Sequence, residues 1–142
     1  MMKKIIWSMV LSLFTGLGFA YYLYNKPNRR ISDETPAFIL KAETLVSEYD
    51  VDEKKANAKY LGKVVEVFGI IAEKSKNEKG KYNITLQGSD LAGIGCEFEK
   101  NSQKELSILK EGQKIKIKGI CAGILMDVVL VDCVVMDNKI IF

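Results

Sequence analysis

The chain has 142 residues, no histidine and three cysteines, and its formal net charge of +3 comes from 21 basic and 18 acidic side chains. This length leaves room for one apolar segment and a single domain. Without histidine the chain lacks the usual general base at neutral pH and the commonest metal ligand, and its cysteines have no Cys-x-x-Cys spacing. We therefore expect no catalytic activity, no metal and no cofactor.

An uncharged run of twenty residues, Ile5 to Tyr24, opens the chain. As a helix it would reach about 30 Å, the thickness of the hydrocarbon core of a bilayer. Trp7 lies near one end of the run and three tyrosines lie near the other, as in membrane interfaces. We expect residues 1–25 to form a retained single-pass anchor, with the following domain outside the cytoplasm. A cleaved signal peptide remains the alternative, with Gly18 and Ala20 as the small residues before the cut.

The positive charge belongs to the flanks of this run rather than to the domain. The first thirty residues carry five basic side chains and no acid, namely Lys3, Lys4, Lys26, Arg29 and Arg30. The other 112 residues hold 16 lysines against 18 acids, so the domain is slightly acidic. Attraction to anionic lipid explains the basic flanks, and nucleic acid is not the expected partner.

Residues 26–34 are polar and predict a tether, and residues 35–61 predict a helical extension. Thr35 followed by Pro36 is typical of a helix start. Apolar side chains then recur at helical spacing as far as Tyr49, and Asp52 could cap a second short helix.

Residues 62–142 show the alternation of strands, interrupted by one helix that begins with a capping box at Ser102 and Glu105 and stops at Gly112. The strands are expected over residues 63–72, 81–86, 94–99, 114–119 and 127–135. Three strands, a helix and two strands in about eighty residues is the order of the OB-fold, a five-stranded Greek-key barrel. We therefore expect a mainly β domain of this class.

The alternation of the last two strands suggests a register in which Lys116 faces Asp132 and Ile117 faces Val131. This register places Cys121 and Cys133 too far apart for a disulfide. A bridge between Cys96 and Cys133 stays open, and three buried free thiols are the preferred state.

OB-folds bind their ligands across the second and third strands and the neighbouring loops. Candidate ligand-binding side chains are those expected to point outward there, with one more from the first strand: Lys81, Asn83, Thr85, Glu97, Glu99 and Phe68. Because two of them are carboxylates and the second and third strands present no aromatic side chain, a protein or polar ligand fits better than stacked bases. The loops 74–80 and 122–126 are alternative contact sites. The helical extension could cover Phe68 and its apolar neighbours, or this patch could contact other proteins.

Four stretches of the chain, within residues 60–69, 96–98, 109–119 and 121–133, resemble the tRNA-anti-like family of bacterial OB-fold proteins. The resemblance covers Glu43 to Val135. It implies an OB barrel with a helical extension, exported as a lipoprotein or held by an N-terminal anchor, and it implies nucleic-acid binding by fold analogy only. No cysteine follows the apolar run to accept a lipid, so the helix itself would be the anchor.

These observations predict a membrane-anchored, non-catalytic binding or recruitment module that contacts a protein or polar ligand at the cell envelope. Single-stranded nucleic-acid binding and a purely structural envelope role are the alternatives. The oligomeric state stays open.

Overall fold

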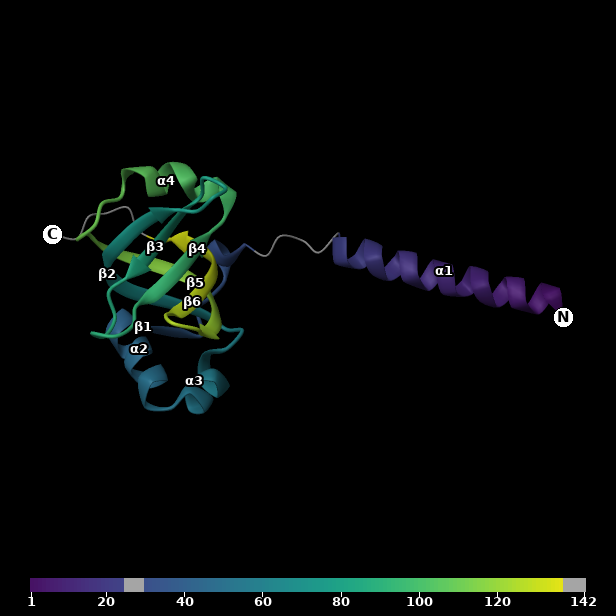
Figure 1. The fold of residues 1–142 in the computed structure, drawn as a ribbon, viewed down its shortest axis with the longest axis horizontal. Helices are drawn as coiled ribbons and strands as arrows, with labels where there is room; N and C mark the ends of the chain where they lie inside the picture. The colour runs from purple at the N-terminus through teal and green to yellow at the C-terminus, as the bar shows by residue number, and fades with distance from the viewer. Residues whose placement is uncertain (25–29, 137–142) are drawn as a thin grey trace.

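A computed structural model describes residues 1–24 and 30–136 (Figure 1). Lys26, Arg29 and the last six residues of the expected barrel lie outside the described residues. The elements, in chain order, are α1 (Met2–Tyr24), η1 (Ile31–Asp33), β1 (Phe38–Lys41), α2 (Ala42–Val51), α3 (Glu53–Tyr60), β2 (Val64–Lys76), β3 (Tyr82–Leu86), β4 (Ile94–Phe98), η2 (Lys100–Ser102), α4 (Gln103–Ile108), β5 (Lys114–Ile124) and β6 (Val128–Val135).

The N-terminal apolar run forms the 23-residue helix α1, and none of its residues is buried. Among the described residues it is the only helix long and apolar enough to cross a membrane, a property that a signal sequence shares. The expected apolar helix is therefore present.

Five strands close into a barrel. Their order around it is β2, β3, β4, β6 and β5, and β5 pairs again with β2. The β4–β6 pair is parallel and the other pairs are antiparallel. This is the order expected for an OB-fold, with α4 inserted between the third and fourth barrel strands, so the predicted fold class is confirmed.

Closure depends on the length of β2, whose 13 residues serve two neighbours. Val64 to Ile70 pairs with β5, and Ile71 to Lys76 pairs with β3. The register with β3 shifts between Ile71 and Glu73, at an irregularity of the kind that bends a strand and increases its twist. One long bent strand thus joins both sides of the barrel.

The segment before α2 differs from the expectation. Phe38 to Lys41 is not helical but forms β1, which runs parallel to the first half of β2. Without β1, that edge of β2 would leave backbone groups unpaired, so strand pairing prevails over the local helix signal at Pro36. The helix begins only at Ala42.

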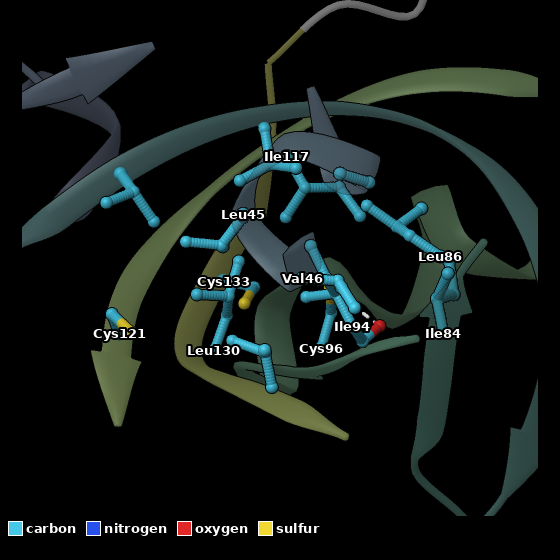
Figure 2. Packing of buried hydrophobic residues seen from close by; sticks show 14 of the residues in the cluster. Leu45, Val46, Ile84, Leu86, Ile94, Cys96, Ile117, Cys121, Leu130 and Cys133 are labelled. Atoms are coloured by element: carbon cyan, nitrogen blue, oxygen red, sulfur yellow. Dashed lines mark hydrogen bonds between the residues drawn. The ribbon is translucent and has the colours of Figure 1, made fainter. Parts of the chain in front are cut away.

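Helices close the barrel at both ends, with α2 and α3 at one end and α4 at the other (Figure 1). Figure 2 shows Leu45 and Val46 of α2 among the barrel side chains, where both are fully buried. Leu106 of α4 is buried at the opposite end. The apolar face of α2 therefore fills the barrel, and it does not cover the outer face around Phe68, whose side chain is 37% exposed.

The helix ends follow the sequence signals only in part. Asp52 caps α3 as expected, because its carboxylate accepts a hydrogen bond from the backbone N–H of Lys55 at 3.1 Å. Ser102 makes no capping hydrogen bond with its side chain, and α4 starts at Gln103 after a 3-10 turn. Gly112 adopts a φ of 86°, which suits glycine at the turn that follows α4.

The register expected for the last two strands is wrong. Ile117 pairs with Val135 and Ile120 with Val131, and the ladder contains two register shifts. Bulges of this kind cannot be seen in an alternating pattern, because each adds one residue to one strand only. The pairing also extends to Ile124 opposite Val128, so most of the expected loop 122–126 is strand.

All three cysteines are free and buried. Burial and a hydrogen bond with Cys96 raise the pKa of the Cys133 thiol well above its usual value. The Sγ of Cys121 lies 3.3 Å from the Tyr49 hydroxyl on α2. The thiols thus act as part of the core, as the sequence suggested.

We expect none of the three thiols to react with a thiol reagent in the native protein, because all three sulfur atoms are buried and inaccessible to the reagent. Titration with a chromogenic disulfide reagent should give no native thiol and three after denaturation. Fewer than three thiols in the denatured, unreduced protein would contradict the free-thiol state.

Gly88 tests the packing of α2 into the barrel. A Cβ at this position would lie 2.6 Å from Cγ2 of Val46 and 2.5 Å from the carbonyl oxygen of Ala92. We expect Gly88→Ala to lower the free energy of unfolding by about 1 to 3 kcal/mol through overpacking.

The matched control is Gly95→Ala, where the nearest atom would lie 4.0 Å away. Urea unfolding of the full chain in a nonionic detergent measures the free energy of unfolding of both variants. Equal stability of the two variants would contradict the close contact between α2 and the barrel.

Candidate ligand-binding groove

The structure brings together part of the predicted binding face. Asn83 lies opposite Glu97, and Thr85 lies opposite Gly95, on the neighbouring strands β3 and β4. Lys81 immediately precedes β3, and Glu99 follows the end of β4. These five residues therefore lie on or next to one two-stranded surface.

This surface is continued by β2, which places Ser75 opposite Asn83 and Glu73 opposite Thr85. With Glu97 opposite Asn83, the strands themselves place two carboxylates on this face, and β3 and β4 present no outward aromatic ring there. Such a face repels phosphates and offers no platform for stacked bases.

The two aromatic side chains of these strands are occupied elsewhere. Phe98 is buried in the core, and Tyr82 is half-buried and packs against the core. The Nζ atoms of Lys74 and Lys76 each lie 4.6 Å from the centre of the Tyr82 ring. Neither ring is free to receive a ligand from the outer face.

Phe68, the sixth predicted residue, lies at a different place. It is on the first half of β2, paired with Lys41 of β1 and with Lys116 of β5. It therefore does not join the β3–β4 surface. It belongs instead to a groove that the sequence did not predict.

The groove lies beside Gly69 and Ile70 of β2, between the stretch that pairs with β1, which ends at Phe68, and the stretch that pairs with β3, which begins at Ile71. Its volume is about 330 Å³. Residues of the β1–α2 junction, the middle of β2, the end of β3 and the start of β5 line it: Lys41, Ala42, Glu43, Phe68, Gly69, Ile70, Gln87, Lys114, Ile115 and Lys116. Because β2 lacks a full strand partner along one edge there, its surface is accessible from outside the barrel.

Three lysines and one acid give the groove a positive charge. Lys41 and Lys114 are exposed, and Glu43 is the acidic residue of the lining. The Nζ of Lys116 lies 4.6 Å from the centre of the Phe68 ring and 3.4 Å from Oε1 of Glu66. The groove thus combines cations, one aromatic ring and the amide of Gln87.

Gly69 allows α2 to approach the floor of the groove. A Cβ there would lie 3.0 Å from Cβ of Ala42 and 3.2 Å from Cδ1 of Leu86. These distances are shorter than ordinary van der Waals contacts, so the absence of a side chain lets the start of α2 and the end of β3 meet over β2.

Next to the groove, the same row of cross-strand pairs continues with Glu66 opposite Lys118, and both side chains are buried. The Nζ of Lys118 donates hydrogen bonds to the carbonyl oxygens of Ser32 at 3.1 Å and Glu34 at 2.8 Å. By the alternation of lysines with other residues over 114–119, Lys118 would lie on the solvent side with Lys114 and Lys116. Instead it fastens the segment around η1 to the barrel.

Lys118→Met should remove both hydrogen bonds and leave two carbonyl oxygens without them. We expect a loss of about 2 to 4 kcal/mol in the free energy of unfolding, together with faster tryptic cleavage after Arg30. Urea unfolding and timed proteolysis of the full chain measure the two effects.

Lys114→Met is the matched control, because Lys114 is an exposed lysine on the same strand. It should change the stability by no more than about 0.5 kcal/mol. Unchanged proteolysis in the Lys118 variant would contradict the fastening role.

Among residues 1–24 and 30–136, no three His, Cys, Asp or Glu side chains are grouped closely enough to hold a metal ion.

The sequence pointed to Phe68 alone among the residues of the groove. The alternation in 114–118 indicates that Lys114 and Lys116 lie on one side of their strand. That they lie beside Phe68 follows only from the register between β2 and β5. Lys41 could not be found, because its segment was expected to be helical.

Comparison with known proteins agrees with the fold. The tRNA_anti-like family model matches residues 1–135. A crystal structure from Klebsiella pneumoniae, named "putative nucleic acid-binding lipoprotein", is 19% identical and superposes with a TM-score of 0.55, covering 69% of this chain and 91% of that protein. Asparaginyl-tRNA synthetase from Entamoeba histolytica is 17% identical with a TM-score of 0.44, covering 75% of this chain and 25% of the synthetase. No curated protein matches the sequence significantly.

Proposed function

Because this chain belongs to the tRNA_anti-like family, we propose that its OB-fold domain is a non-catalytic binding module, held at the membrane by α1. Its ligand is an acidic segment of a partner protein, which binds in the groove around Phe68. The observation that carries this proposal is the pair of exposed lysines, Lys41 and Lys114, in a groove that also holds the Phe68 ring.

The groove suits carboxylates in an extended segment. Lys41 and Lys114 lie on the two sides of β2, and both are exposed, so they are accessible to charged side chains of a partner. At an effective dielectric constant of 20, a carboxylate at about 4 Å from one ammonium gains about 4 kcal/mol before desolvation is counted. Phe68 and Ile70 add apolar surface between the charges.

An acidic protein segment fits better than nucleic acid. Lys116 lies over the Phe68 ring, so this ring is not an open stacking platform. The β3–β4 surface, where OB-folds receive single strands, presents Glu97 and has Glu73 next to it. A strand of phosphates that left the groove along this surface would meet negative charge.

Single-stranded nucleic acid is the second candidate, because an aromatic ring among lysines is also the combination that such ligands use. The name of the Klebsiella protein refers to nucleic acid, although its low identity makes the likeness one of fold. Lys41, Lys114 and Phe68 would then contact the phosphates and one base.

The anchoring role rests on the length and exposure of α1, which has no buried residue. The absence of catalysis rests on the missing histidine and on the buried state of the three thiols.

Charge reversal in the groove tests the binding proposal. We expect the double variant Lys41→Glu with Lys114→Glu to weaken binding of a fluorescent oligoglutamate at least tenfold, because it exchanges two attractive charges for two repulsive ones. The assay uses the full chain in a nonionic detergent at about 50 and 200 mM salt, with oligothymidylate as the competing probe.

The matched control reverses two exposed lysines outside the groove, Lys79→Glu with Lys104→Glu, and should bind as the unaltered protein does. Stronger binding of oligothymidylate, with a steep salt dependence and loss in the groove variant, would establish the second candidate. Equal binding by the groove and control variants would refute a site around Phe68.

A further inference from the structure

Three large apolar side chains at one end of the barrel are almost completely exposed. Leu91 is 93% exposed in the β3–β4 loop, and Leu125 and Met126 are each 89% exposed in the β5–β6 turn. Turns usually carry small or polar residues at their tips. Clustered apolar residues of this kind mark an interaction surface.

The two tips are neighbours. The backbone N–H of Gly93, two residues after Leu91, donates to Oδ1 of Asp127 at 2.8 Å. The N–H of Val128 donates to the carbonyl oxygen of Gly93 at 3.1 Å. The loop and the turn are therefore joined by hydrogen bonds immediately behind their apolar tips.

Several backbone N–H groups of both tips already have hydrogen-bond acceptors within the protein. The N–H groups of Leu91 and Ala92 both donate to Oγ of Ser89, at 3.3 and 3.1 Å. The N–H of Leu125 donates to the carbonyl oxygen of Asp127 at 3.1 Å. Because these donors are already bonded within the protein, moving the tips out of water costs less than it would for open loops.

We propose that Leu91, Leu125 and Met126 form an apolar wedge that enters the surface of the lipid bilayer in which α1 is anchored. The inference rests on the anchoring part of the proposed function and does not depend on the ligand of the Phe68 groove. Apolar side chains that reach below the headgroups in this way hold a domain in one orientation on the membrane.

The length of the tether is compatible with this contact. The seven peptide steps from Tyr24 to Ile31 reach at most about 24 Å. Ser32, next to the end of this segment, accepts a hydrogen bond from Lys118, and Lys118 pairs with Val134 of β6. From Val134 to Val128, which lies directly behind the tips, β6 spans about 20 Å. The tips can therefore reach the surface from which α1 emerges.

Both signs of charge lie near the wedge. Asp90 is exposed next to Leu91 and Asp127 is half-buried behind Met126, whereas α3, which adjoins the end of β5, carries three lysines. Phosphatidylcholine, which has no net charge, therefore reports the apolar contact apart from electrostatic attraction to lipid.

Tryptophan fluorescence tests the wedge in the full chain, reconstituted in phosphatidylcholine vesicles with and without bromine on the acyl chains. Trp7 is the only tryptophan of the chain. In the unaltered protein it reports whether α1 lies in the bilayer. In a Trp7→Phe background, Leu125→Trp places the only indole at the wedge, and Ile108→Trp places it at another exposed apolar position, on α4 at the other end of the barrel.

We expect brominated lipid to quench Trp7 and the indole at position 125, with an emission shift to shorter wavelength for the latter, and to leave the indole at position 108 unquenched. Adding Leu91→Asp and Met126→Asp to the Leu125→Trp chain should remove the quenching at position 125.

Quenching of Trp7 without quenching at position 125 would overturn the wedge and leave the anchor intact. A shorter emission wavelength at position 125 without bromine quenching would overturn it in favour of a second copy of the chain. Equal quenching at positions 108 and 125 would overturn it by showing adsorption without a preferred face. An unquenched Trp7 would overturn both the anchor and the wedge.

Discussion

The double pairing of β2 is the constraint on which the rest of the domain depends. Its first half completes a ladder with β5 and its second half a ladder with β3, so this one strand closes the barrel. The change of partner leaves a short stretch at Phe68 to Ile70 where one edge of β2 has no full strand beside it. β1 covers the edge before this stretch, and the start of α2 and Gln87 border it. The groove is therefore a direct consequence of how the barrel closes.

The domain separates its charges between two surfaces of the same sheet. The outer face of β3 and β4 carries Glu97, with Glu73 beside it, whereas the groove one step along β2 carries Lys41, Lys114 and Lys116. The net charge of the domain is small, so composition alone does not reveal this separation. The fold thus places the lysine-containing groove away from the strands that the OB-fold usually offers to single-stranded nucleic acid, and a likeness of fold does not transfer a binding site.

The candidate site was partly visible in the sequence. Alternation in β3 and β4 identifies Asn83, Thr85 and Glu97 as outward, and the structure places them on one surface. The same alternation in β5 is misleading for Lys118, which is buried and donates its ammonium hydrogen bonds to the carbonyl oxygens of Ser32 in η1 and of Glu34, directly after it. Phe68 was recognised as outward, but its neighbours come from β1, α2 and β5, which lie far from it along the chain.

The sequence by itself determined the apolar helix α1, the order of the barrel strands with the inserted helix, the cap at Asp52 and the burial of the cysteines. Each of these depends on residues within a few positions of one another, through hydrophobic periodicity, charge and capping chemistry. Only the tertiary structure decided that Phe38 to Lys41 is a strand, that the β5–β6 ladder contains two shifts, and that three lysines surround Phe68. Periodicity reports which side of a strand a residue occupies, whereas the identity of the neighbouring strand and its register are set by packing between distant segments.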